Sequence, residues 1–292
     1  MTGRSMIAVF CAVLTALTGT ACLTIQNDTT TKHKTFKEKA KMVSFISHRG
    51  ESKDAPENTL EAFELSNARD VEGMECDIHF TAEKILVCSH DFDTMRRAGV
   101  KRVIEETSLA ELQSLDVSGG PDAFGGKYAG AKIPLFTDSL KTLKPGRKYY
   151  VEVKANDESV LPAMRADIEK SGIPMDQIVL ISFHADMVDL ARKYMPEIPR
   201  LWLTWVGKRQ DGSISISYED VFATLERIGA TGLDVGGDDM LTPEFLKEVK
   251  ARGYYLAVWT IDTEERCRYF IENGVDAITS NCAAAMKEAC SK

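Results

Sequence analysis

The sequence predicts an α/β protein, a (β/α)8 TIM barrel with a small inserted loop and helix region. After Val43, short apolar runs alternate with amphipathic segments, and polar motifs stand where several of these runs end. This alternation is typical of parallel strands joined by crossover helices, and about eight such units close a barrel whose functional groups gather at the carboxyl ends of the strands. With 292 residues, 44% of them hydrophobic, the chain can bury one sizeable core.

Eight apolar runs are expected to form the strands, because they are short and many are rich in β-branched or aromatic residues. They lie at 43–47, 73–78, 148–153, 177–183, 200–205, 231–235, 255–261 and 276–280. Helices are expected at 58–68, 159–172, 185–195, 218–229, 242–253 and 263–274. Asn58, Ser159 and Thr242 can cap the starts of three of them.

The region from Asp93 to Pro145 is less regular. Its glycine clusters at 119–120 and 125–126 predict loops over the barrel mouth, with helices at 108–115 and 135–143. Two interpretations stay open for this insertion, which follows His90. It either shapes access for the alcohol part of a substrate or is a passive surface loop.

Alternating positions in two predicted strands place charged side chains on a common face. Glu75 and Asp77 flank Cys76, so both carboxylates point to one side of the strand and the thiol to the other. Glu152 and Lys154 repeat this spacing on another strand. Because converging carboxylates bind hard divalent cations, a metal can bridge these strands.

Two histidines complete a set of groups suited to phosphodiester chemistry. His48 and His90 each follow an apolar run at a strand end. Imidazoles titrate near neutral pH, so they can take a proton from a nucleophile and return one to a leaving alcohol. Arg49 and Lys154 supply positive charge for the phosphate oxygens. The sequence therefore predicts a metal-dependent phosphodiesterase.

The ordered motifs resemble the glycerophosphodiester phosphodiesterase family. Each motif alone is weak, but the ordered set is specific and runs from about Val43 to about Asn281. The set comprises His48-Arg49-Gly50, PENT at 56–59, ECD at 75–77, His90-Asp91, VEVK at 151–154 and Trp259-Thr260.

This resemblance implies hydrolysis of glycerophosphodiesters to glycerol 3-phosphate and an alcohol, with Ca²⁺ or Mg²⁺ as the metal. It makes His48 and His90 the general acid and base and places Trp259 beside the glycerol moiety. Arg49 and Lys154 match positions that hold phosphate oxygens. The implied metal ligands are Glu57, Glu75, Asp77 and Glu152.

Alternatives remain open for the function and for single residues. A related phospholipase acting on intact or lyso lipids, or a non-catalytic phosphodiester-binding envelope protein, is also compatible with these motifs. Glu57 can instead serve the first turn of the helix that begins near Asn58. Trp259 can be a core residue, and Lys154 can form a surface pair with Glu152.

Three segments depart from the family pattern. Residues 81–84, Thr-Ala-Glu-Lys, replace Thr-x-Asp-Gly, so the hairpin after Asp77 is expected to differ in shape. Asp262 stands where the family commonly has Asn, and Thr279-Ser280-Asn281 replaces a common Thr-Asp pair. These differences bear on specificity more than on catalysis.

The first residues are typical of a secretory signal. Residues 1–21 contain Arg4, the apolar stretch MIAVFCAVLTAL and small residues before Cys22. Lipidation of Cys22 would give a membrane-anchored lipoprotein, whereas cleavage alone would give a periplasmic protein, and both stay open. Residues 22–42 are polar and charge-rich, which predicts a flexible tether before a barrel domain at 43–292.

Charge and cysteine content limit the partners. The formal net charge of -8 argues against nucleic acid, whereas a small-molecule phosphodiester can be bound by local cations. Export would permit a disulfide between Cys76 and Cys88, but free buried thiols are the favoured interpretation. The sequence does not indicate an oligomeric state.

Overall fold

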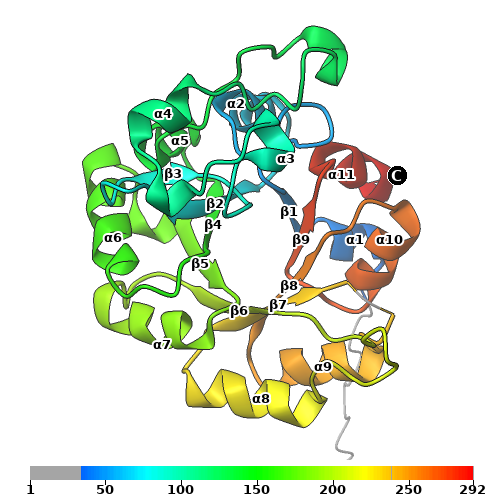
Figure 1. Ribbon diagram of the computed structural model, residues 1–292. Coiled ribbons are helices and arrows are strands. Elements are labelled where there is room, and N and C mark those ends of the chain that lie inside the picture. The colour runs from blue at the N-terminus through cyan, green and yellow to red at the C-terminus, as the bar shows by residue number, and fades with distance from the viewer. Residues whose placement is uncertain (1–33, 238, 292) are drawn as a thin grey trace, which may run out of the picture. The chain divides into compact units, whose positions relative to one another are not determined.

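Within the described residues, 34–237 and 239–291, eight parallel strands form a closed ring, which Figure 1 views along its axis. Neighbours follow the order β1, β9, β8, β7, β6, β5, β4, β2, and pairing of β1 with β2 closes the ring. The strands are β1 (Ser44–Ser47), β2 (Gly73–Phe80), β4 (Lys148–Val153), β5 (Ile178–Ser182), β6 (Arg200–Thr204), β7 (Gly232–Gly236), β8 (Tyr255–Trp259) and β9 (Ala277–Ser280). The predicted barrel and its predicted strands are confirmed.

Helices surround the ring, and all but the last of them connect successive strands (Figure 1). They are α2 (Leu60–Ala68), α5 (Phe136–Thr142), α6 (Val160–Ser171), α7 (Ala185–Tyr194), α8 (Tyr218–Arg227), α9 (Pro243–Ala251), α10 (Glu264–Glu272) and α11 (Ala283–Ser291). The helix predicted at 135–143 is α5, which precedes β4 and so belongs to the barrel. The final helix, α11, was not predicted, because only Ala283 and Cys290 of its residues are buried and its sequence carries no apolar stripe.

A short helix before the barrel corrects part of the predicted tether. Phe36–Ala40 form α1, which begins with a capping box between Thr35 and Glu38. The Arg268 guanidinium of α10 lies 4.8 Å from the centroid of the Phe36 ring. These contacts order a segment that its charge-rich composition did not mark as helical. The predicted signal at 1–21 and Cys22 lie outside the described residues.

The insertion between β2 and β4 carries its own small core. It contains β3 (Leu86–Cys88), α3 (Met95–Ala98), η1 (Ile104–Glu106), α4 (Leu109–Ser114) and η2 (Ala123–Gly126). Of these, β3 pairs antiparallel with β2, and α4 is the helix predicted at 108–115. Its buried apolar residues are Val87, Ile104, Leu112, Val117 and Ile133. This packing fixes α3 near the carboxyl ends of β1 and β2 (Figure 1).

The turn between β2 and β3 shows what one family departure does to the backbone. Lys84 stands where the family has glycine and adopts a left-handed φ of 59°. The turn still closes, because Lys84 N–H donates to Thr81 O and Thr81 N–H donates to Ile85 O, both at 2.9 Å. A hairpin therefore forms with a residue that is strained at this φ.

Helix caps agree with the sequence only in part. Thr242 caps α9 by accepting from Phe245 N–H at 3.3 Å, as predicted. Ser159 makes no side-chain cap bond to α6, and the cap of α2 is Thr59, not Asn58. Asn58 is consequently available for another role.

The strands separate two apolar layers. An inner layer fills the barrel, and an outer layer packs between the ring and the helices. The inner residues are Ile46, Tyr150, Val179, Ile181, Leu201, Leu203, Ala257 and Ala277. Cys76 and Cys88 lie in the outer layer as free buried thiols, the interpretation that the sequence favoured.

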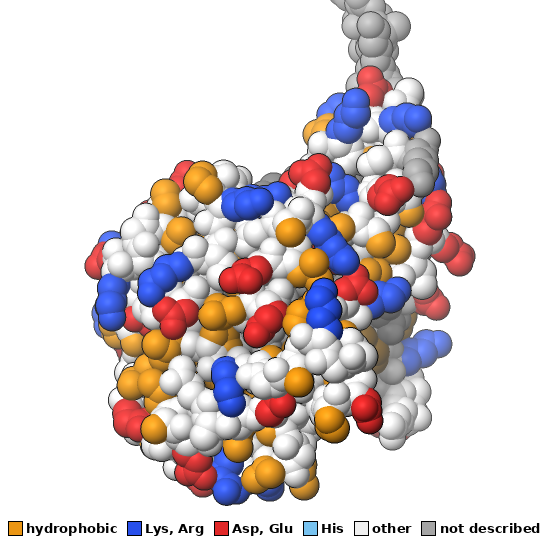
Figure 2. All heavy atoms as spheres, turned by 90° about the horizontal axis from the view of Figure 1, so that it is seen from above, with side chains coloured by type: hydrophobic (Ala, Val, Ile, Leu, Met, Phe, Trp, Pro, Cys, Tyr) orange, Lys and Arg blue, Asp and Glu red, His pale blue; other side chains and the backbone are white. Residues whose placement is uncertain are grey.

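The surface carries both signs of charge. On the face drawn in Figure 2, basic and acidic side chains are interspersed among hydrophobic ones. Among the described residues, no helix combines the length and hydrophobicity needed to cross a bilayer.

Lys84 gives a test of backbone strain. We expect Lys84→Gly to raise the free energy of unfolding by about 1 kcal/mol relative to Lys84→Ala, because both variants lose the side chain but only alanine keeps a Cβ at positive φ. Urea denaturation followed by circular dichroism measures the difference. Equal stability of the two variants would contradict the strain.

Candidate active site

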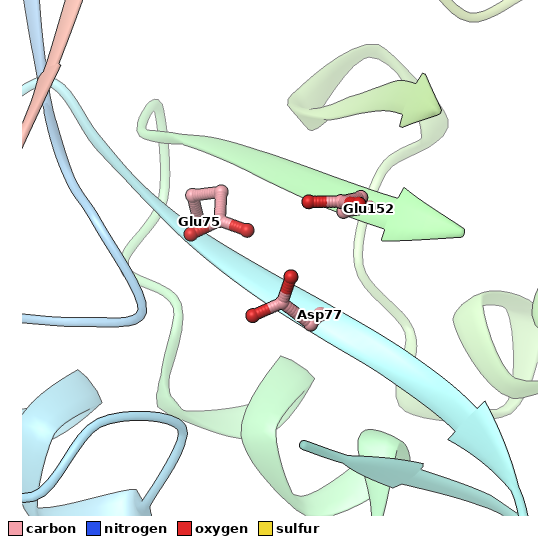
Figure 3. A group of neighbouring side chains, drawn as sticks. All are labelled: Glu75, Asp77 and Glu152. Carbon is pink, nitrogen blue, oxygen red and sulfur yellow. The ribbon is translucent and has the colours of Figure 1, made fainter. Parts of the chain in front are cut away.

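Three buried carboxylates meet near the carboxyl ends of β2 and β4. Oxygens of Glu75, Asp77 and Glu152 all lie within 4.8 Å of one another, and Figure 3 shows the side chains gathered along the two adjacent strands. Asp77 pairs with Glu152 in the strand register, and Glu75 precedes Asp77 by one alternation. Cys76 faces the outer core. The predicted common face of the carboxylates is confirmed.

The crowding of like charges perturbs these carboxyl groups. Burial, and then the charge of Asp77, raise the pKa of Glu75 well above its ordinary value and that of Glu152 to about 8. Burial opposes ionisation of Asp77 as well, but the charges of Lys154 and Arg49 hold its pKa below the ordinary value. A divalent cation fits this group, because it would let all three carboxylates ionise and it prefers oxygen ligands.

Two cationic side chains border the carboxylates. Lys154 Nζ lies 2.9 Å from Glu152 Oε1 and 3.4 Å from Asp77 Oδ1. Arg49 Nε lies 3.3 Å from Asp77 Oδ2, and Arg49 N–H donates to Glu75 Oε2 at 2.8 Å. Lys154 is therefore not a simple surface pair with Glu152, since it also contacts a buried carboxylate on another strand.

A strained turn directs Arg49 toward this group. The φ angles of Arg49 and Gly50 are 56° and 76°, both in the left-handed region. A Cβ at Gly50 would lie 2.6 Å from the Ala62 backbone of α2, so glycine is required at that point. Backbone strain of this kind is common at functional sites.

Asn58 is a site residue that sequence reasoning missed. Its side-chain N–H donates to Asp77 Oδ2 at 2.8 Å, and its Oδ1 accepts from Asp77 N–H at 3.2 Å. Its own backbone N–H donates to Arg49 O at 3.0 Å. Asn58 thus orients a carboxylate of the group, and the available signal was its position directly after Glu57.

Glu57 lies beside the carboxylate group rather than within it. Arg49 Nη1 donates to Glu57 Oε1 at 3.0 Å, and Arg96 donates to both Glu57 oxygens at 2.7 and 2.8 Å. Although burial opposes it, the hydrogen bonds from Arg96 and the charge of Arg49 lower the pKa of Glu57 to about 2. The structure therefore groups three of the four predicted metal ligands and places the fourth between two arginines.

Arg96 also connects the insertion to His90. His90 Nδ1 lies 2.7 Å from Asp91 Oδ1, and Arg96 Nε donates to Asp91 Oδ2 at 2.6 Å. An ionised carboxylate only accepts, so Nδ1 carries the hydrogen and Nε2 remains for another partner. The sequence did not single out Arg96, because a basic residue on a short exposed helix is ordinary.

His48 is held by residues from the other end of the chain. Its Nδ1 lies 2.7 Å from Asn281 Oδ1, while Asn281 Nδ2 donates to Asp262 Oδ2 at 2.6 Å. Burial, and then the charge of Arg49, lower the pKa of His48 to about 4, so the ring is neutral at pH 7. Asp262 and Asn281 belong to the two other segments in which the chain departs from the family pattern, and the structure brings them into contact.

A cavity of about 170 Å³ connects these groups. One part of its wall carries His48, Arg49, Glu75, His90 and Glu152, and the other carries Ile181, Phe183, Leu203, Asp234, Trp259, Thr260 and Thr279. Trp259 is half-buried and edge-on to Phe183, with ring centroids 5.6 Å apart, and it lines the cavity while also packing against the inner apolar layer. The rings of His79 and His184 contact the backbone carbonyls of His90 and Lys154.

Known proteins resemble this chain in sequence and architecture. The Glycerophosphoryl diester phosphodiesterase family matches residues 48–284. Glycerophosphodiester phosphodiesterases of Caldanaerobacter subterraneus subsp. tengcongensis and Bacillus subtilis are 25% and 23% identical, over 81% of this chain and 93% and 82% of theirs. An Oleispira antarctica phosphodiesterase solved with the product sn-glycerol-3-phosphate has a TM-score of 0.76 at 24% identity, over 87% of this chain and 98% of that chain.

The barrel, its acidic cavity and the family match define a (β/α)8 hydrolase with a carboxylate group suited to a metal ion. The chain belongs to the glycerophosphoryl diester phosphodiesterase family, whose members hydrolyse glycerophosphodiesters. The resemblance predicted from the ordered motifs is confirmed.

Asn58 gives a test of how Asp77 is oriented. We expect Asn58→Gly to weaken divalent-cation binding by about 10- to 100-fold, the usual effect of removing a partner of a metal ligand. Glycine tolerates the φ of 54° at this position, so the variant removes the amide without adding strain. Isothermal titration calorimetry measures the affinity, and wild-type affinity in the variant would refute the role.

The His48–Asn281 contact gives a test by pH. We expect the His48 ring of the metal-free protein to stay neutral down to about pH 4, and Asn281→Asp to raise its pKa, since a carboxylate beside Nδ1 favours the imidazolium. NMR titration of the ring measures both values. Asn273→Asp adds the same charge at the end of α10 and serves as the control. An unchanged His48 pKa in Asn281→Asp would argue against the contact.

Proposed function

We propose that this enzyme hydrolyses glycerophosphodiesters to glycerol 3-phosphate and an alcohol with one divalent cation, Ca²⁺ or Mg²⁺, and with His48 and His90 as general base and acid. The observation that carries the proposal is that both imidazoles line one cavity with the carboxylate group. Phosphodiester cleavage needs charge neutralisation and two proton transfers, and this cavity offers a residue for each.

Glu75, Asp77 and Glu152 would hold the cation, and Glu57 supports Arg49 through their ion pair. When bound, the cation neutralises charge on the phosphate oxygens and polarises the phosphorus centre toward attack. Arg49 and Lys154 bind the remaining anionic oxygens, because both lie against the carboxylate group.

The two histidines differ in their surroundings. His48 is neutral and its Nδ1–H is directed at Asn281. Nε2 is therefore the atom that takes a proton from the nucleophile that attacks phosphorus. Asp91 fixes the His90 ring in the orientation that leaves Nε2 for the oxygen of the leaving alcohol. Trp259 provides an apolar wall for the glycerol carbons.

A second candidate is a phospholipase that acts on intact or lyso lipids, and the distribution of exposed apolar side chains favours it. Phe92, at 66% exposed, follows β3, and Phe183 and Trp205 directly follow β5 and β6. Met95, Phe124 and Ile214 are exposed as well. Parallel measurements with a lysophospholipid and with glycerophosphocholine separate the two candidates, since the preferred substrate of a phospholipase would carry an acyl chain.

We further propose export through residues 1–21, with Cys22 either lipidated or left as the first mature residue. The basic residue, apolar stretch and small residues of this segment support the proposal. Cell fractionation of the full chain tests it: export predicts an envelope location, and lipidation predicts that Cys22→Ser releases the protein from the membrane fraction.

The histidine roles are tested by substitution. We expect His48→Ala and His90→Ala each to lower kcat for glycerol 3-phosphate release by about 10²- to 10⁴-fold, the range for loss of an acid or base. Circular dichroism and metal binding of both variants should match the wild type. Near-normal turnover in either variant would refute its assignment.

Metal dependence is tested by removal and return of the cation. We expect chelator to abolish activity and Ca²⁺ or Mg²⁺ to restore it. Independently of activity, saturating metal should raise the Tm of the wild type but not of Glu152→Gln, because a ligand that binds only the folded state stabilises it. Full activity of metal-free protein would contradict the proposal.

A further inference from the structure

Asp234 is a buried carboxylate that the hydrolytic steps above do not use. Within β7, Leu233 and Val235 face the outer core, so Gly232, Asp234 and Gly236 face the barrel interior. Because the other two are glycines, Asp234 is the one side chain that described residues 232–236 present to the interior. It is 1% exposed and lines the active-site cavity.

The Asp234 carboxyl lacks a partner for one of its oxygens. Oδ1 accepts no hydrogen bond from any described residue. The nearby hydroxyls of Tyr150 and Tyr255 lie 2.9 Å apart and hydrogen-bond to each other. Burial raises the pKa of Asp234 to about 7. Keeping such a group in an enzyme cavity destabilises the fold, which points to a ligand that supplies the missing hydrogen bond.

The ring order places Asp234 across the barrel from the carboxylate group. Four strand pairings separate β7 from β2 in either direction around the eight-membered ring of described strands, so the two strands are opposite each other. The cavity between them has about 170 Å³, whereas about 10–15 Å³ accommodates one water. Glu75 and Glu152 line it on one side and Asp234 on the other, so a ligand of several atoms fits between them.

Apolar side chains lie beside Asp234 on the neighbouring strands. Leu203 is its neighbour in the register of β6 and β7, and Trp259 Nε1–H donates to Asp234 O at 3.4 Å. Phe183 packs edge-on against Trp259. This wall suits a short carbon chain that ends in one hydrogen-bond donor.

We propose that Asp234 is a specificity-determining residue that accepts a hydrogen bond from the terminal hydroxyl of the substrate's glycerol moiety. The inference rests on the proposed function and deepens it by assigning one residue to the recognition of the free glycerol end. A phosphate bound at β2 directs the three-carbon chain across the cavity toward β7. An acyl ester on the terminal oxygen removes the donor and leaves the carboxylate unpaired, so acylated substrates are disfavoured.

The test compares two phosphodiesters of choline, one of glycerol and one of propane-1,2-diol. Both carry the phosphate, a hydroxyl on the carbon next to the phosphorylated one, and choline as the leaving alcohol. Only the glycerol diester has a further hydroxyl at the end of the carbon chain. For the wild type we expect kcat/KM to be at least about 100-fold higher with the glycerol diester, since sites built for a hydroxyl reject analogues that lack it.

Substitution of Asp234 should remove this preference. We expect Asp234→Leu to lose at least about 100-fold on the glycerol diester while staying within about threefold of wild type on the propanediol diester. Asp234→Asn is the matched control, because its amide oxygen still accepts, and it should keep most of the preference.

Several outcomes would overturn the proposal. The first is a wild type with equal kcat/KM on the two diesters. The second is an Asp234→Leu variant whose kcat/KM falls equally on both diesters, or on neither. The proposal is also overturned if Asp234→Asn loses the preference as fully as Asp234→Leu does, because the amide oxygen of asparagine still accepts a hydrogen bond. The wild-type comparison stands even where Asp234→Leu fails to fold. Wild-type protein that hydrolyses neither diester instead refutes the proposed function, and this inference with it.

Discussion

The mutual repulsion of three buried carboxylates is the constraint on which the site depends. Without compensation, burial of Glu75, Asp77 and Glu152 within 4.8 Å of one another favours protonation over charge. Closure of the ring by β1 and β2 relieves this, because it brings the strained turn at Arg49 beside β2, while Lys154 arrives on β4 from the other side. A site with this balance is suited to a divalent cation and an anionic substrate together.

The orientation of the two imidazoles depends on parts of the chain that are far apart. His90 is set by Asp91 and by Arg96 of α3, and α3 belongs to an insertion with its own small core. His48 is set by Asn281, which Asp262 holds in turn. The two family departures at 262 and 281 therefore form one interacting pair, and Arg96 of the insertion contacts the carboxylate that holds His90.

Periodicity predicted the barrel, because strand alternation and helix spacing are local properties. It also predicted that Glu75 and Asp77 share a face. It did not predict Asn58 or Arg96, since their roles depend on contacts across 19 and 39 residues that no local pattern encodes. The sequence did not predict a role for Asp234 for a similar reason. It lies within an apolar run that predicts a strand, and only the closed ring shows that its side chain faces the carboxylates.

Two features of the molecule bear oppositely on substrate choice, and their magnitudes differ. Apolar side chains such as Phe92 and Trp205 are exposed in loops that follow strands, where they can add contact with an acyl chain. One additional methylene in an apolar pocket changes discrimination by about 10- to 200-fold, whereas a hydroxyl-binding site that loses its donor changes it by about 10⁴- to 10⁵-fold. The interior carboxylate at Asp234 therefore outweighs single contacts at the exposed loops, and the cavity selects for the free glycerol end.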